Sequence, residues 1–486
     1  MDSPGPFRLS CFWRPYSLSP LNMGFVVSVL YLVVNYLTPP TVFGPLAAFR
    51  VELILAMVIT VLSIPTLARS IVLKTPQSLA LIGLAFAGSL SILFGQHWLG
   101  GAVQAFPAFF PCAFAYFLVC LHCNSKRKLQ AIVLMLLFVC LFVIAHGYID
   151  LLHGVAEGNS VGSADSEASL EIWNSEHPYL LAMKSGGGES FYRLKGLGLI
   201  NDPNDFGQLL VCVIPLVFIL WRPKNVLRNL TFVVLPVSVL LYGTYLTHSR
   251  GALLALLAMA VVAARRRIGT LPALLLASGL FVAAMSLHFT GGREISANSG
   301  SDRTELWSES LQLLKSHPLF GVGIGNLSDY LSYTAHNSVM VCAAELGFVG
   351  LFFWSLFLFS TVRDALEMAS SEKVSEGKQI IPEEGRFHFG NAKIEALNRD
   401  EVNRLGRLLV LSLTGLLVAG WFLSRAYVIT LFLLGGIVEV VYEMALQRGM
   451  ISHRLRLARL LPLAVGLAIS LVLLMYIVLR VSNLMR

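Results

Sequence analysis

The chain has 486 residues, of which 56% are hydrophobic and 13% charged, and its mean hydropathy is +0.72. Too few polar side chains remain to cover a water-soluble globule, so the composition excludes that class and predicts an integral membrane protein. The formal net charge of +8 would suit a nucleic acid. The basic residues, however, lie mainly in short connections between apolar segments, where they set membrane topology. We therefore expect no nucleic-acid partner.

Apolar segments long enough to cross about 30 Å of hydrocarbon, at about 1.5 Å per helical residue, recur along the whole chain. The first follows Arg8 and Arg14 without a small-residue cleavage site, so we expect it to remain as a span. The pattern predicts an all-α fold, a single integral membrane domain over 1–486 with about 12–13 transmembrane helices. The segments fall near 22–38, 45–64, 78–95, 99–121, 129–152, 205–221, 229–246, 250–264, 270–289, 338–362, 405–423, 427–446 and 461–480.

Charge sets the expected orientation of these spans. With a cytoplasmic N-terminus, alternation places the basic clusters at 126–128 and 265–267 and the polar loop 363–404 inside, as the positive-inside rule requires. The same alternation places the loops 153–204 and 290–337 outside.

The two outer loops differ in composition. Residues 154–190 are rich in Gly, Ser and acidic residues, which predicts a mobile flap or linker. Residues 302–316 have apolar side chains at helical spacing from Leu306, which predicts an amphipathic helix on the membrane surface with Asp302 as its N-cap. Trp307 and Trp354 are interpreted as interface or packing aromatics.

Several arginines lie at the outer ends of the apolar segments, on the side of the membrane where the positive-inside rule does not require positive charge. His336 lies in the same outer loop as one of these arginines. Positive charge that topology does not require suggests an anion site, here with one titratable group beside it. The arginines are Arg193, Arg250, Arg303 and Arg425.

A set of short motifs resembles the O-antigen ligase and polymerase superfamily. The resemblance covers roughly 190–360 by motif and most of the chain by hydropathy. The matching pieces are Arg193-Leu194-Lys195-Gly196 leading to Asp202-Pro203-Asn204-Asp205, Ser249-Arg250-Gly251-Ala252, Arg303-Thr304-Glu305-Leu306-Trp307, His317-Pro318 before Gly321-Val322-Gly323-Ile324-Gly325, and Ala335-His336-Asn337 with Glu345.

This resemblance implies a glycosyltransferase of the bacterial inner membrane that acts at the periplasmic face without a metal or other cofactor. Its donor would be a polyprenyl-pyrophosphate-linked oligosaccharide and its acceptor a glycan or a lipid-linked glycan. Membrane lipids and other polysaccharide-assembly proteins are further expected partners. The superfamily includes both polymerases and ligases, and the motifs leave these two activities open.

The chemistry of glycosyl transfer independently suits these residue types. The departing pyrophosphate needs charge stabilisation, which arginine provides bidentately, and the incoming hydroxyl must lose a proton, which histidine with its pKa of about 6.5 can accept. We expect His336 to be the general base, with Arg250 and Arg303 catalytic. The expected substrate-binding residues are Arg193, His317, Arg425 and Glu345.

Each assignment has an ordinary alternative. His317, before a proline, can simply end a helix, and Arg250 can be a snorkelling helix-end arginine. Arg193 and Arg303 can be solvated loop charges. The alternative function for the whole chain is a polytopic transporter of anions or lipid-linked glycans, which would show ionisable residues and broken helices near the bilayer midplane. Metal-dependent transfer through Asp202 and Asp205 is a further alternative.

Overall fold

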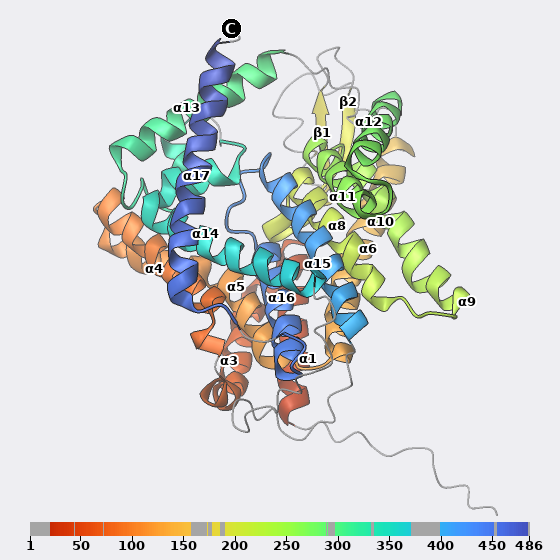
Figure 1. Ribbon diagram of the computed structural model, residues 1–486. Helices are drawn as coiled ribbons and strands as arrows, with labels where there is room; N and C mark the ends of the chain where they lie inside the picture. The colour runs from red at the N-terminus through yellow and green to blue at the C-terminus, as the bar shows by residue number, and fades with distance from the viewer. Residues whose placement is uncertain are drawn as a thin grey trace, which may run out of the picture.

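The computed structural model describes residues 20–42, 44–70, 72–156, 173, 177–184, 190–287, 289, 297–331, 335–370, 399–451 and 454–484. Nearly all of them are helical, as Figure 1 shows, which confirms the expected fold class. The helices of seven residues or more are α1 (Pro20–Leu37), α3 (Val51–Arg69), α4 (Pro76–Gly95), α5 (Leu99–His122), α6 (Lys126–Ala156), α8 (Pro203–Val217), α10 (Leu235–Leu246), α11 (Arg250–Ile268), α12 (Thr270–Ser286), α13 (Ala297–Ser316), α14 (Ser338–Ser370), α15 (Arg399–Gly420), α16 (Ile429–Gln447) and α17 (Leu457–Leu484).

Each apolar segment expected from the sequence forms a helix. In the described part of the chain, 10 helices are long and apolar enough to cross a membrane, and Met23–Leu37 and Thr270–Ser286 are shorter apolar helices. α9 (Val226–Asn229) continues through a π-helical turn into α10, so that these elements form one span, Val226–Leu246. The remaining expected segment is α11, which ends in three arginines.

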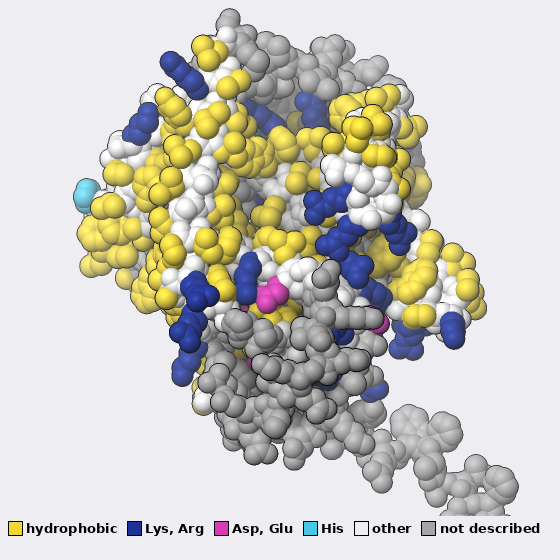
Figure 2. All heavy atoms as spheres, viewed as in Figure 1, with side chains coloured by type: hydrophobic (Ala, Val, Ile, Leu, Met, Phe, Trp, Pro, Cys, Tyr) yellow, Lys and Arg dark blue, Asp and Glu magenta, His cyan; other side chains and the backbone are white. Residues whose placement is uncertain are grey.

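The outer surface of the bundle is apolar. Only 17% of the apolar window of α17 is buried, and Figure 2 shows hydrophobic side chains along this helix. Leu473 and Ile477, for example, are 54% and 55% exposed. Such a surface is stable only in contact with hydrocarbon, so the protein is a multi-pass membrane protein.

The loop 153–204 contains the one departure from all-helical structure in the described residues. Strands β1 (Leu180–Lys184) and β2 (Ser190–Leu194) form an antiparallel hairpin in which Leu181 pairs with Arg193. The expected flap over 154–190 lies mostly outside the described residues. In Figure 1 the hairpin and α13 lie at the end of the bundle where α17 terminates.

α13 is the amphipathic helix expected before the His336 loop, but its start differs. The helix begins at Ala297, so Asp302 lies inside it and the expected N-cap is wrong. The apolar period that begins at Leu306 marked only the packed part of the helix, where Leu306, Trp307, Leu311 and Leu314 are buried. The sequence before Leu306 carries no such period.

α14 is broken at Gly347, where φ is 62° and ψ is −163°. The glycine-rich segment 318–325 docks its backbone against this break. The amides of Val322 and Gly323 donate to the carbonyl oxygens of Ala344 and Glu345, both at 3.0 Å. The amide of Phe348 donates in turn to the carbonyl oxygen of Pro318 at 2.8 Å. These bonds satisfy backbone groups that the break would otherwise leave unpaired in an apolar environment.

Glycine is required on both sides of this contact. A Cβ at Gly321, whose φ is 68°, would lie 2.4 Å from the Glu345 carbonyl oxygen, and one at Gly347 would lie 2.4 Å from that of Leu319. The glycines therefore let the chain dock its backbone closely on the broken helix.

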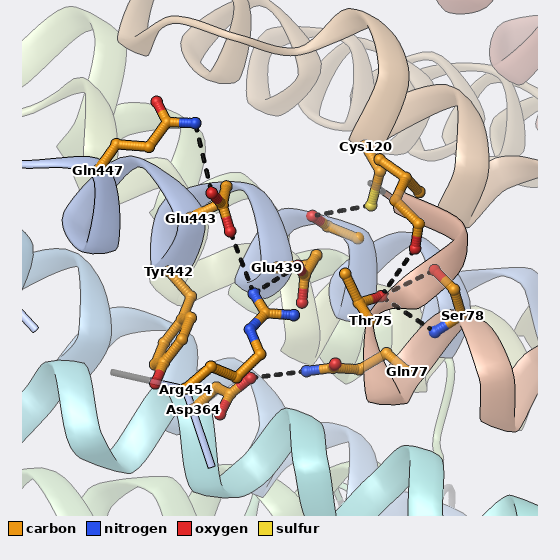
Figure 3. Close-up of polar contacts among 12 residues, drawn as sticks. Thr75, Gln77, Ser78, Cys120, Asp364, Glu439, Tyr442, Glu443, Gln447 and Arg454 are labelled. Atoms are coloured by element: carbon orange, nitrogen blue, oxygen red, sulfur yellow. Dashed lines mark hydrogen bonds and ion pairs between the residues drawn. The ribbon is translucent and has the colours of Figure 1, made fainter. Parts of the chain in front are cut away.

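A buried polar network ties α4, α14, α16 and the α16–α17 connection together, as Figure 3 shows. Arg454 donates to Glu439 at 2.6 Å, and Gln77 donates to Asp364 at 2.7 Å. Arg454 and Arg363 both lie over the ring of Tyr442. Buried charges of this kind are tolerated only when paired, so the network fixes how these helices meet.

Candidate functional site

His336 lies at the end of the connection 317–337 between α13 and α14, and hydrogen bonds hold this end from two sides. The indole nitrogen of Trp307 on α13 donates to the carbonyl oxygen of Ala335 at 2.7 Å. The backbone amide of His336 donates to the hydroxyl of Ser424, in the α15–α16 connection, at 2.7 Å. These bonds keep His336 in the left-handed region, at φ 46°, a conformation that costs free energy for a residue with a side chain.

Asn337 starts α14 directly after this histidine. Its side-chain oxygen accepts from the amides of Val339 at 2.9 Å and Met340 at 3.1 Å, and its amide nitrogen donates to the Trp421 carbonyl oxygen at 3.1 Å. This is an N-cap with a second anchor directly after the end of α15. The residue after the candidate base is therefore rigid.

Arg303 on α13 lies near the His336 ring, and Arg250 at the start of α11 lies near Arg303. Burial lowers the pKa of His336 below its ordinary value of 6.5, and the charge of Arg303 lowers it further, while Asp202 opposes them. Burial also lowers the pKa of Arg303, and the nearby charge of Arg250 adds to that effect. The structure thus brings together Arg250, Arg303 and His336. The first and the last of these are 86 residues apart in the sequence. A neutral imidazole beside guanidinium groups can accept a proton.

Three helices begin around this group. α8 starts at Pro203 with Asp202 as N-cap, α11 starts at Arg250 with Ser249 as N-cap, and α14 starts after Asn337. The amide groups and the positive end of each helix dipole favour an anion there. Together with the arginines, this gives the site a strong preference for negative charge.

Arg425 approaches the site from the α15–α16 connection, next to Ser424. Its Nε donates to Asp205 Oδ2 at 2.6 Å, across 220 positions in sequence. The Asp205 side chain is 3% exposed and that of Arg425 43%. The buried carboxylate therefore orients an arginine that remains accessible to a ligand.

Arg193 has a different environment from the other three arginines. It is 3% exposed on β2, and it donates from Nε to the Thr247 carbonyl oxygen and from Nη2 to the Asn204 side chain, both at 2.9 Å. Arg193 thus ties the hairpin to the starts of α8 and α11. These contacts position the loops around the site.

His317 directly precedes the glycine-rich segment, and Glu345 lies on α14 where this segment docks. His317 follows α13, with its Nδ1 3.0 Å from the Ser316 hydroxyl. Glu345 is 5% exposed, and its carboxylate faces the backbone amides of Gly325 and Leu327. Glu345 was expected to bind substrate. Here it supports the segment that docks at the break in α14.

Some residues that shape the site gave no clear signal in the sequence. Trp307 was interpreted as a packing or interface aromatic, which describes its burial but omits its bond to Ala335. Ser424, Asn204 and Thr247 are common polar residues, and only the fold shows that they contact the site. Asp202 and Asp205, considered as a metal pair, instead cap α8 and pair with Arg425. Within the described residues, no group of three His, Cys, Asp or Glu side chains could hold a metal ion.

Comparison with known proteins gives one match. Residues 235–355 match the family model described as O-Antigen ligase. This region runs from α10 into α14 and includes Arg250, Arg303, His317, His336 and Glu345 but neither Arg193 nor Arg425. No curated protein and no solved structure matches the chain. The protein is therefore a polytopic membrane protein in which residues 235–355 are similar to the O-antigen ligase family.

Proposed function

We propose that this protein transfers or polymerises saccharide from a polyprenyl-pyrophosphate-linked donor at the periplasmic face of a bacterial inner membrane. One observation supports this most directly: His336, which burial and Arg303 keep neutral, lies beside arginines at a junction of helix N-termini. That arrangement matches the two requirements of transfer from a glycosyl pyrophosphate. The family match supports the same reaction class.

In the proposed reaction, His336 takes the proton from an acceptor hydroxyl as that oxygen bonds to the anomeric carbon. The bond from this carbon to the pyrophosphate oxygen breaks, and its electron pair leaves with the lipid pyrophosphate. Arg250, Arg303 and Arg425 bind the leaving group as its negative charge increases. Arg193, held by Thr247 and Asn204, positions the loops rather than touching the reacting atoms. No step requires a metal ion.

The proposed membrane arrangement follows the positive-inside rule. The loops 153–204 and 290–337, the second containing the catalytic histidine, lie outside, and 363–404 lies in the cytoplasm. Segment 371–398 of the last loop falls outside the described residues. Lys126, at the start of α6, pairs with Glu401 near the start of α15, so these two helix ends share a side of the bundle as this topology requires.

The experiment that tests the function uses purified protein in detergent with a lipid-linked donor and a chelator present. Protein in detergent encloses no sealed compartment, so transport across a membrane cannot contribute to the measured product. We expect the parent protein to transfer glycan and His336→Ala to transfer at a rate lower by ~10² or more, because a general base is lost. Donor binding should survive, since the arginines remain. If the parent shows no transfer with any acceptor but gives saturable uptake in sealed vesicles, the protein is a transporter.

Polymerase and ligase are distinguished by what accumulates when the gene is deleted. Unpolymerised lipid-linked single repeats indicate a polymerase. Long unattached chains indicate a ligase.

A further inference from the structure

A cavity of about 350 Å³ lies between the two parts of α14 and helices α15, α16 and α17. Its volume falls within the range of about 300–1,000 Å³ that is usual for ligand sites. Most of its wall is hydrocarbon, and large side chains from all four helices contribute to it. They include Trp354, Phe359, Leu416, Leu431, Leu467 and Leu471.

Two polar residues of the wall belong to the site around His336. Ser338 is two residues after this histidine, and Arg425 follows the serine that binds the histidine amide. Ser338 and Gln208 already donate to the carbonyl oxygens of Leu423 and Leu416, at 2.8 and 2.9 Å. The Arg425 guanidinium is the charged group in the wall. The cavity therefore suits an amphiphile with a hydrocarbon chain and an anionic head.

We propose that this cavity holds the isoprenoid units next to the pyrophosphate of the donor, which rests on the function proposed above. The chemistry of the donor favours this occupant over a lipid-linked acceptor. In the donor, the hydrocarbon begins directly at the pyrophosphate, so it must leave the site beside the guanidinium groups. In such an acceptor, sugar units separate the reacting hydroxyl from the lipid. An apolar cavity that includes Arg425 in its wall fits the first geometry.

The test fills the cavity from α17, the helix between the cavity and the surface. Leu467→Trp and Leu471→Trp each place an indole in the cavity. Leu473→Trp is the matched control, because this side chain of the same helix is 54% exposed on the outer surface. The donors carry the same glycan on the same pyrophosphate, with either a full-length polyprenyl chain or, as the short-chain donor, an ethyl group that is too short to occupy the cavity.

The parent and the Leu473→Trp protein should show a lower KM for the long-chain donor than for the short-chain donor. Filling the cavity should raise the KM for the long-chain donor by about tenfold and reduce this preference, because apolar contacts are lost. A cavity-filled protein that keeps the parent's chain-length preference would overturn the proposal. So would an increase in the KM for a lipid-linked acceptor alone, since that would place the acceptor's lipid in the cavity.

A second readout separates this inference from the proposed function. Photocrosslinking with a polyprenyl pyrophosphate that carries a photoreactive isoprenoid and no glycan reports binding without any transfer. Labelling of the parent on α14–α17 that Leu467→Trp reduces and Leu473→Trp does not would support the cavity assignment even if no transfer occurred. Equal labelling of all three proteins would refute the assignment even if the parent transferred glycan.

Discussion

The indole of Trp307 donates a hydrogen bond to the carbonyl oxygen of Ala335, one residue before His336. Trp307 itself lies four residues after Arg303 on α13. The bond therefore links the helix that presents an arginine to the segment that presents the histidine. It explains how a loop residue at φ 46° can hold a fixed position.

Trp307→Phe keeps most of the apolar packing and removes this bond. We expect a loss of about 1–2 kcal/mol in unfolding free energy, because the buried Ala335 carbonyl loses its donor. Glycan transfer should fall by about tenfold through misplacement of His336, a larger effect than stability alone would give. Thermal unfolding and initial rates of the purified protein measure the two effects. Trp221→Phe, at a side chain that is 40% exposed, is the control and should leave both unchanged.

The low pKa of His336 predicts how activity varies with pH. Because burial and then Arg303 lower this pKa, the imidazole is neutral at pH 7, and kcat should fall only as pH drops through a value below 6.5. Replacing Arg303 with methionine should move this acid limb to higher pH, while Arg407→Met, far from the site on α15, should not. A limb that does not move would show that Arg303 does not act on the base.

The same shift has a consequence for stability. The unfolded chain binds a proton at His336 more readily than the folded protein does, so stability should fall as pH drops below 6.5. The His336→Ala protein should lose less stability than the parent between pH 7 and pH 5. Thermal unfolding at a series of pH values measures this difference, and identical profiles would contradict it.

The arginines at the site need geometry as well as charge. Arg250→Lys and Arg303→Lys should keep the fold but lose most glycan transfer, since an ammonium group cannot reproduce the bidentate contact of a guanidinium with phosphate. The measurement is product formed per folded protein at matched abundance. Near-normal product from both variants would show that these arginines do not bind phosphate and have only an ordinary topological role.

The network around Arg454 should matter for stability rather than for transfer. Arg454→Met leaves the Glu439 carboxylate buried without its partner, which should cost about 3–5 kcal/mol in unfolding free energy. Adding Glu439→Gln should recover much of this loss, since the unpaired charge disappears. Unfolding of the two variants in detergent tests the argument, and a double variant no more stable than Arg454→Met would contradict it.

A cysteine scan checks the orientation of the membrane domain. A cysteine at Ser163 or Ser299 should react with an impermeant thiol reagent from the periplasm, and one at Ser375 should not. Ser163 and Ser375 lie outside the described residues, and Ser299 lies in α13. The six cysteines of the described chain are buried and should give little background. Labelling of all three positions from one side would refute the orientation.

Most of the helical fold could be predicted because hydropathy is a local property. The apolar segments predicted the membrane spans. The alternation of these spans across the membrane predicted that the arginines and His336 lie on the same side. The Arg425–Asp205 pair joins residues 220 positions apart, so no local pattern could have revealed it. The break in α14 was missed for a related reason. A single glycine at position 347 inside an apolar segment does not indicate a break in the helix. Only the backbone of 318–323, docked against α14, shows why a glycine is needed there.

The hairpin was missed because its strands lie in a segment dominated by flexible composition. Leu180–Lys184 is short, and the glycines at 186–188 indicated a linker. Pairing with β2 and the two bonds of Arg193 to α8 and the α10–α11 connection give this stretch its structure. Tertiary contacts therefore overrode the local signal.

The docking of segment 318–323 on the broken α14 also limits which parts of the site can move. The chain leading to His336 is anchored to α14 at one end by the amides of Val322 and Gly323, and at the other end by the Asn337 cap. Tilting α14 would therefore carry both anchors together and leave the histidine in the same place relative to that helix. Any opening that admits a bulky glycan must therefore come from elements that these anchors do not hold, such as the hairpin.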